Sequence, residues 1–129
     1  MKIDLNRVLI TGADGMVGSY VDFGIKTNRS TLDITSFTNV LEFIKEKKPQ
    51  IILHLAALTD MVKCEEDPKS AYLVNSVGTY NLAIVAKELG VKIVYVSTDA
   101  IFPNSNSSHN ISDSSGPESI YGHSKYLGE

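Results

Sequence analysis

The sequence predicts an α/β fold built on a doubly wound parallel β-sheet. Three apolar runs rich in β-branched residues predict buried strands over residues 7–11, 51–58 and 91–98. Amphipathic segments long enough for helices precede the second and third of these runs. Strands separated by helices pair in parallel through right-handed crossovers. With 129 residues, the chain is expected to form one domain, residues 1–129.

The elements between these strands are predicted from local signals. Ser36 or Thr35 suits a helix N-cap, Asp67 before Pro68 suits another, and Gly90 suits a helix end. The expected bounds are 16–24 for a short first helix, 31–34 for a stunted second strand, 36–48 for an amphipathic helix, 68–89 for a long helix, 104–115 for a polar loop and 117–129 for a final helix.

The composition excludes several classes of function. The net charge of −3 and the lack of a Lys or Arg cluster argue against binding to nucleic acid or an anionic membrane. No apolar run approaches the roughly 18 residues of a membrane span, and the N-terminus does not have the pattern of a signal peptide. One cysteine, Cys64, and three scattered histidines give neither a disulfide nor a metal-ligand spacing, so no metal is expected. These features favour a cytoplasmic protein with small-molecule partners.

A glycine-rich turn follows the first strand. Gly12, Gly15 and Gly18 recur at intervals of three, between that strand and the first predicted helix. Such glycines permit a tight turn, close approach of the backbone to a pyrophosphate, and close packing of helix on strand. The positive N-terminus of the predicted helix favours the phosphates. The turn therefore predicts a Rossmann-like NAD(P)-binding fold, with further cofactor contacts from Asp14, Met16 and Val17.

Other candidate cofactor residues have two interpretations each. Arg29 can pair with the 2′-phosphate of NADP or can be a solvated surface residue, so NADP and NAD both stay open. Ala56 and Ala57 leave room for a ribose or nicotinamide group, or permit tight helix packing. Asn75, on the inward stripe of the long helix, ties strand ends together beside the cofactor or is an ordinary satisfied core amide. His54 is expected to be a core histidine.

Tyr121 and Lys125 form a candidate acid and its partner. Their i, i+4 spacing places both side chains on one face of the final helix. A nearby ammonium favours the phenolate, so Tyr121 can exchange a proton with a substrate carbonyl oxygen. Lys125 is also expected to hold the ribose hydroxyls of the cofactor. Thr98 ends the third strand at the carboxyl edge of the sheet, where its hydroxyl can orient the substrate carbonyl.

Seven segments carry a resemblance to a known family. They are TGADGMVG, LDIT, HLAALT, KCEEDP, AYLVN, VSTDAIF and YGHSKYLGE, in this order. They resemble the N-terminal half of the dTDP-4-dehydrorhamnose reductases, which are extended short-chain dehydrogenases. The resemblance implies NAD(P)H-dependent reduction of a nucleotide-linked 4-keto-6-deoxysugar, with hydride transfer to C4. It further implies that Asp33 and Ile34 lie at the adenine side, that Thr59 faces the sugar nucleotide, and that the catalytic triad is Thr98, Tyr121 and Lys125.

Two departures from the family affect the expected function. Related dehydratases carry an Asp-Glu pair where this chain has Asp99 and Ala100, and GDP-fucose synthases carry a catalytic cysteine where Ala100 stands. The reductases often have an aromatic residue there. The family also continues into a C-terminal substrate lobe, whereas this sequence ends at Glu129. The alternatives are a non-catalytic regulatory or partner-binding module, a nucleotide-binding fragment, and another nucleotide-sugar epimerase or reductase. A homodimer is a further expectation.

Overall fold

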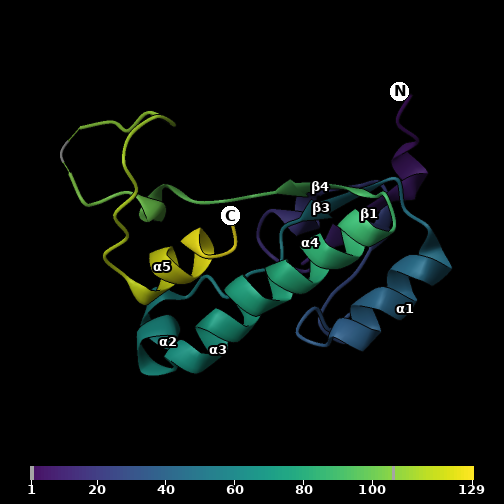
Figure 1. The fold of residues 1–129 in the computed structure, drawn as a ribbon, viewed down its shortest axis with the longest axis horizontal. Helices are drawn as coiled ribbons and strands as arrows, with labels where there is room; N and C mark the ends of the chain where they lie inside the picture. Colours follow the sequence, from purple (N-terminus) through teal and green to yellow (C-terminus); the bar gives the residue numbers. More distant parts are fainter. Residues whose placement is uncertain (1, 106) are drawn as a thin grey trace.

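Among the described residues, four parallel strands form one sheet in the order β2-β1-β3-β4, and Figure 1 labels β1, β3 and β4. The computed structural model describes residues 2–105 and 107–129. The strands are β1 (Val8–Thr11), β2 (Ile25–Lys26), β3 (Ile51–His54) and β4 (Lys92–Tyr95). The helices are η1 (Leu5–Arg7), η2 (Gly18–Tyr20), α1 (Phe37–Lys47), α2 (Met61–Glu66), α3 (Pro68–Tyr72), η3 (Leu73–Gly78), α4 (Thr79–Glu88), η4 (Asp99–Ile101) and α5 (Ile120–Tyr126). The prediction of a parallel α/β fold is confirmed.

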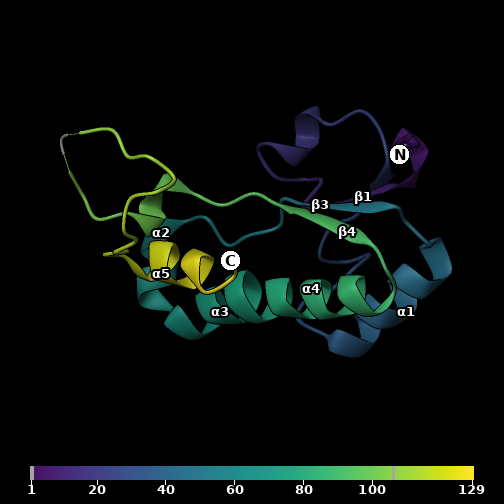
Figure 2. The same cartoon turned by 45° about the horizontal axis from the view of Figure 1, so that its top comes forward.

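The pleat of the strands divides the core between the two faces of the sheet. On one face, α1 and α4 pack over Leu9 and Ile52, and this cluster also includes Val40, Ile44 and Leu82. The other face carries a smaller cluster, Val8, Ile10, Ala13 and Ile51. Figure 2 shows α1 and α4 on one side of the sheet and the segment with η2 on the other. Side chains alternate along a strand, so each central strand contributes to both clusters.

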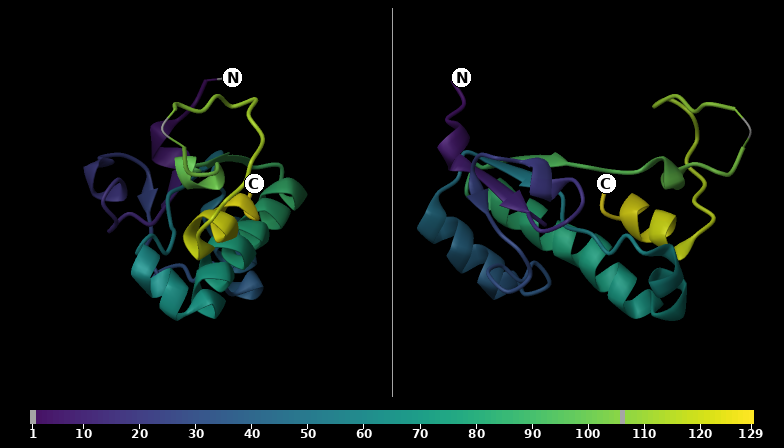
Figure 3. Two further views of the ribbon diagram at one scale, coloured as in Figure 1. Left: turned by 90° about the vertical axis from the view of Figure 1, so that its left-hand side faces the viewer. Right: turned by 180° about the vertical axis from the view of Figure 1, so that it is seen from behind.

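The predicted long helix is present from Pro68 to Glu88 and contains a π-helical segment, η3, between α3 and α4. Asp67 caps it as expected, because its carboxylate accepts the Ser70 N–H at 3.1 Å. Gly90 follows with φ +67°, which glycine adopts without strain. At the far end of the sheet, α5 packs beside α2 and α3 (Figure 3). Within the described residues, no helix has the length and apolar character needed to cross a bilayer.

The predicted helix over residues 16–24 is wrong. The chain forms only the short 3₁₀ turn η2 there, and Met16 and Tyr20 are each 88% exposed. Gly24 turns with φ +82°, and β2 begins at the next residue. Because β2 starts so soon after the glycine-rich turn, the connection is too short for several helical turns. An α-helix N-terminus therefore does not contribute to the glycine turn.

The second strand was expected at residues 31–34, but it is β2 at Ile25–Lys26. Pairing decides this, because Leu9 lies opposite Ile25 and Ile10 opposite Lys26. Leu32 and Ile34 are buried without strand pairing, in the cluster under α1. Other elements are shorter than predicted: β3 ends at His54 rather than at residue 58, β4 spans Lys92–Tyr95 rather than 91–98, and α5 spans Ile120–Tyr126 rather than 117–129.

Candidate dinucleotide site

The glycine-rich turn is held tightly against the end of β3. Gly12 has φ +70°, and a Cβ placed on it would lie 2.7 Å from the Ala56 backbone. A Cβ on Gly18 would collide with the Gly12 carbonyl oxygen. Gly15 differs, because its Cβ would meet only the Gly12 oxygen, at 3.2 Å. Gly12 and Gly18 are thus required by the fold, whereas the absence of a side chain at Gly15 leaves open space.

The backbone of this turn offers hydrogen-bond donors. The Gly15 N–H donates to the Gly12 carbonyl at 3.0 Å, and the Ala13 N–H donates to the Thr27 carbonyl at 2.9 Å. Among the described residues, no backbone acceptor is present for the amides of Asp14, Met16 and Val17. Exposed amides that lack an internal partner can bind an anion such as a diphosphate.

The turn forms part of a cleft of about 520 Å³. Its walls include twelve predicted site residues: Gly12, Asp14, Gly15, Met16, Val17, Gly18, Arg29, Asp33, Ile34, Ala56, Ala57 and Thr59. The remaining walls come from residues beside them in the sequence, from Thr11, and from Val74 of η3. Segments far apart in the sequence thus converge at the carboxyl ends of β1, β2 and β3, the edge where parallel sheets bind ligands.

One end of this cleft is organised by Asn28, which the sequence did not single out. The Asn28 side-chain Nδ2 donates to the Asp14 carboxylate at 2.6 Å, and its Oδ1 accepts the Ser30 N–H at 3.0 Å.

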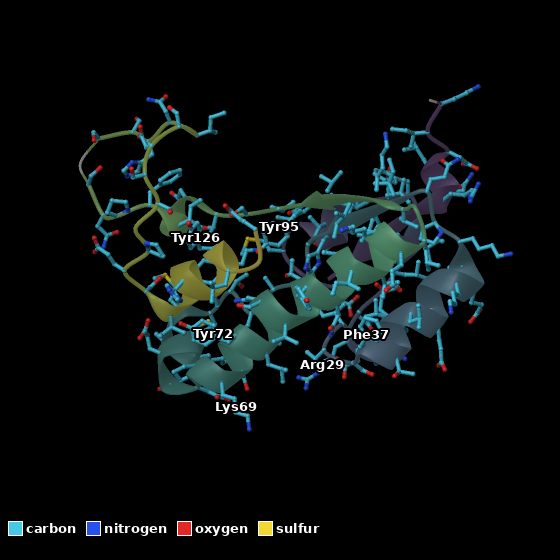
Figure 4. The ribbon with its side chains drawn as sticks, viewed as in Figure 1. Arg29, Phe37, Lys69, Tyr72, Tyr95 and Tyr126 are labelled. Carbon is cyan, nitrogen blue, oxygen red and sulfur yellow. The ribbon has the colours of Figure 1, made fainter. Side chains whose placement is uncertain are left out.

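Asp33 lines the same cleft, and hydrogen bonds from the Thr35 hydroxyl and backbone amide lower the pKa of its carboxyl group. Arg29 is exposed at this end of the cleft and adds a weaker electrostatic contribution to that lowering (Figure 4). Asp14 and Asp33 are thus both engaged in hydrogen bonds, and the exposed Arg29 lines the same cleft.

Asn75 does not line the cleft but fixes one of its walls. Its side-chain oxygen accepts the Leu58 N–H at 2.7 Å, and its Nδ2 donates to the Leu58 carbonyl at 3.0 Å. Nδ2 also donates to the Ser124 hydroxyl of α5 at 3.0 Å. The prediction that Asn75 ties two strand ends together and lines the cofactor pocket is therefore wrong: the amide ties the segment after β3 to helix α5 and lies outside the cleft.

The Lys125 side chain of α5 is buried against β4 and the residue that follows it. Its ammonium donates to the Val96 carbonyl at 2.7 Å and lies 4.2 Å from the centre of the Tyr95 ring. The Tyr95 hydroxyl in turn donates a hydrogen bond to the Lys125 carbonyl at 3.0 Å. Burial lowers the pKa of Lys125 to about 8, and the Glu129 carboxylate opposes this change. A buried ammonium that uses one of its three protons keeps the other two for further acceptors.

Tyr121 and Thr98 lie on elements that pack against each other. Both Tyr121 and Lys125 are in α5, with the expected i, i+4 spacing. Gly122 is required beside them, since a Cβ there would collide with the Ala100 carbonyl oxygen of η4. Thr98 caps η4 by accepting the Ala100 N–H at 3.2 Å. Neither Thr98 nor α5 lines the 520 Å³ cleft, so a joint site of cleft and α5 stays a prediction.

Three residues of this region were missed at the sequence level. Thr11 ends β1 and lines the cleft, and a polar residue directly before the first glycine was the available signal. Asn28 was detectable only as an ordinary turn residue. Gly122, next to Tyr121, was the signal that α5 approaches another backbone closely.

Comparison with known proteins identifies the family. The family described as RmlD substrate binding domain matches residues 6–129. The spore coat polysaccharide biosynthesis protein SpsK of Bacillus subtilis is 30% identical, over 97% of this chain and 47% of that protein. The dTDP-4-dehydrorhamnose reductase of Mycolicibacterium smegmatis is 32% identical, over 100% of this chain and 42% of that protein.

A solved structure agrees. The dTDP-4-dehydrorhamnose reductase of Bacillus anthracis, in complex with NADP, matches with a TM-score of 0.89 and 32% identity, over 99% of this chain and 49% of that chain. The chain spans about half the length of the relatives it matches. Because the family match extends over nearly every residue, the chain belongs to the RmlD substrate-binding domain family, as its resemblance to the dTDP-4-dehydrorhamnose reductases predicted.

Proposed function

We propose that the chain binds NADP or NAD in the cleft and forms the cofactor half of a reductase for nucleotide-linked 4-keto-6-deoxysugars. The observation that carries the proposal is the cleft itself, in which the turn from Gly12 to Gly18 and the pair Ala56 and Ala57 share one cavity. The reductase of Bacillus anthracis that binds NADP supports the choice of cofactor. The relatives named as dTDP-4-dehydrorhamnose reductases support the substrate class.

The residues fit a dinucleotide by their chemistry. The open space at Gly15 and the unpaired amides beside it suit a diphosphate. Ala56 and Ala57 present small side chains to the cavity, which leaves room for a ribose. At the other end, Arg29 offers a cation that can pair with a 2′-phosphate, and Asp33 and Ile34 form the wall proposed for the adenine.

The proposed reaction uses α5 for proton transfer. When bound, the reduced dinucleotide supplies a hydride to C4 of the sugar. The Tyr121 hydroxyl donates a proton to the C4 oxygen, and Thr98 hydrogen-bonds to the same oxygen and orients it. The Lys125 ammonium stabilises the phenolate that Tyr121 becomes, and its remaining protons bind ribose hydroxyls. Thr59, on the exposed rim of the cleft, is placed to contact the sugar nucleotide.

The test is to follow oxidation of NADPH by the purified chain with a dTDP-4-keto-6-deoxysugar. We expect turnover that falls by about 10²–10⁴-fold in Tyr121→Phe, because the general acid is lost. Tyr126→Phe is the matched control, since this tyrosine is on the same helix and exposed. Equal turnover in the two variants would contradict the role of Tyr121. Dinucleotide binding without any turnover would restrict the chain to the cofactor-binding step.

Cytoplasmic location and homodimer formation stay predictions.

A further inference from the structure

A chain of buried hydrogen bonds runs beneath the cleft, with His54 of β3 at its centre. The His54 ring is completely buried, as its predicted role as a core histidine requires. Its Nδ1 lies 2.7 Å from the Thr11 hydroxyl oxygen, and its Nε2 lies 2.9 Å from the Thr79 hydroxyl oxygen. Thr11 lines the cleft and Thr79 begins α4. The ring therefore joins the cleft to the helix layer.

The direction of each bond in this chain follows from Thr79. The Thr79 hydroxyl donates its only proton to the Asn75 carbonyl, at 2.7 Å. Its oxygen must then accept from the ring, so Nε2 carries a proton. Because burial and the charge of Lys125 lower the pKa of His54 to about 3, the ring is neutral and Nδ1 is bare. Nδ1 therefore accepts the proton of the Thr11 hydroxyl.

The Thr11 hydroxyl connects His54 to the wall of the cleft. With its proton on His54, the Thr11 oxygen keeps its acceptor sites for two amides, those of Leu55 and Ala56, each at 3.2 Å. Leu55 and Ala56 both line the cleft. The Ala56 backbone packs directly against Gly12, since a Cβ placed on Gly12 would lie only 2.7 Å from it. A change in the Thr11 hydroxyl therefore displaces the wall against which the glycine turn packs.

We propose that His54 is a positioning residue for the dinucleotide site: by accepting the Thr11 proton at Nδ1, it leaves the Thr11 oxygen to hold the Leu55 and Ala56 amides. The effect on cofactor affinity rests on the proposed function, whereas the effect on the two amides does not. An apolar side chain could fill the same position without desolvating two ring nitrogens. The role in positioning explains why a histidine occupies this place in the sheet.

Two substitutions of His54 by an amide residue test the hydrogen bonds of Nδ1 and Nε2 separately. In His54→Asn, the side-chain oxygen takes the place of Nδ1 and accepts from Thr11. In His54→Gln, the longer amide takes the place of Nε2 and reaches Thr79, so Thr11 loses its acceptor. Val85→Ala is the control for lowered stability, because Val85 is buried in α4 and takes no part in the hydrogen-bond chain.

The first readout needs no ligand. We expect amide hydrogen exchange at Leu55 and Ala56 to accelerate about tenfold or more in His54→Gln, but to stay near the original rate in His54→Asn and Val85→Ala. The second readout is the Kd for NADPH, which we expect to rise about tenfold in His54→Gln and less than about threefold in His54→Asn.

The outcomes distinguish the two proposals. If the unaltered chain binds no dinucleotide, the proposed function fails, and hydrogen exchange still tests the role of His54. If both His54 variants accelerate exchange at Leu55 and Ala56 equally, or neither does, His54 is a packing residue and the inference is overturned. Altered exchange without altered Kd in His54→Gln would overturn the link from these amides to the cofactor.

Discussion

The Asn28 side chain donates a hydrogen bond of 2.6 Å to the Asp14 carboxylate and so ties the turn after β2 to the glycine-rich turn after β1. Because residues 16–24 form no α-helix, this bond and the backbone bond from Ala13 to Thr27 hold the glycine turn beside β2. The charge on Asp14 strengthens the side-chain bond. The position of the proposed diphosphate site depends on these contacts.

Asn28→Ala is expected to weaken dinucleotide binding about five- to tenfold and to lower the free energy of unfolding by about 1 kcal/mol. Titration calorimetry and urea unfolding measure the two effects. Asn104→Ala is the matched control, because Asn104 makes a similar exposed amide–carboxylate bond to Glu118, at 2.8 Å. A Kd changed equally by both substitutions would show that the Asn28 bond has no special place in the site.

Arg29→Met should separate NADP from NAD. If the guanidinium pairs with the 2′-phosphate, the Kd for NADP rises about tenfold and the Kd for NAD changes less than about twofold. Lys26→Met removes the same charge from the neighbouring exposed end of β2, outside the cleft, and should change neither Kd. An unchanged preference in Arg29→Met would mean that Arg29 is an ordinary surface residue.

Stability in acid should reveal the buried His54. Because the folded pKa of about 3 lies below the ordinary value of 6.5, the unfolded chain binds more protons between these pH values. The free energy of unfolding therefore rises with pH across this window, by up to about 1.4 kcal/mol per pH unit from this group. Urea unfolding of the original chain and of His54→Asn should show their difference in stability shrinking as pH falls. A difference that is independent of pH would contradict the buried neutral ring.

Lys125 should affect stability in the alkaline range. Its folded pKa of about 8 is below the ordinary value of 10.5, so the unfolded chain again binds more protons between these values. The contribution of Lys125 to the free energy of unfolding therefore rises as pH increases through this window. The free energy of unfolding of Lys125→Met should therefore fall relative to that of the original chain as pH increases from about 8 to about 10. Lys92→Met, at an exposed position of β4, serves as the control and should show no such trend.

The strands β1, β3 and β4 and the helix caps were predictable because local signals decide them. The apolar runs around Leu9 and Ile52 pack in the centre of the sheet, and Ser36 caps α1 by accepting the Asn39 N–H. Gly12 and Gly18 were recognisable because each stands at a close backbone approach. These features need only the nearby sequence and the periodicity of a strand or helix.

The errors concern features that depend on distant partners. Met16 and Tyr20 have the spacing of a helix, but the early start of β2 leaves the connection too short for one. Pairing with Leu9 places β2 at Ile25, and no local signal marks that register. The bonds from Asn75 to Leu58 and Ser124 join segments far apart in the sequence. For this reason the residues that line the cleft were predictable from the sequence, but the hydrogen bonds that hold them in place were not.

The most direct test is a calorimetric titration of NADPH into the chain and into Gly15→Ala. A Cβ at Gly15 meets only the Gly12 oxygen at 3.2 Å, so the variant should fold, while its methyl group occupies the space proposed for the diphosphate. Gly90→Ala strains a remote turn at φ +67° and controls for lost stability. We predict saturable binding that weakens more than about tenfold in Gly15→Ala but not in Gly90→Ala. No binding by the original chain, or equal binding by Gly15→Ala with Tm unchanged, would contradict a dinucleotide site in this cleft.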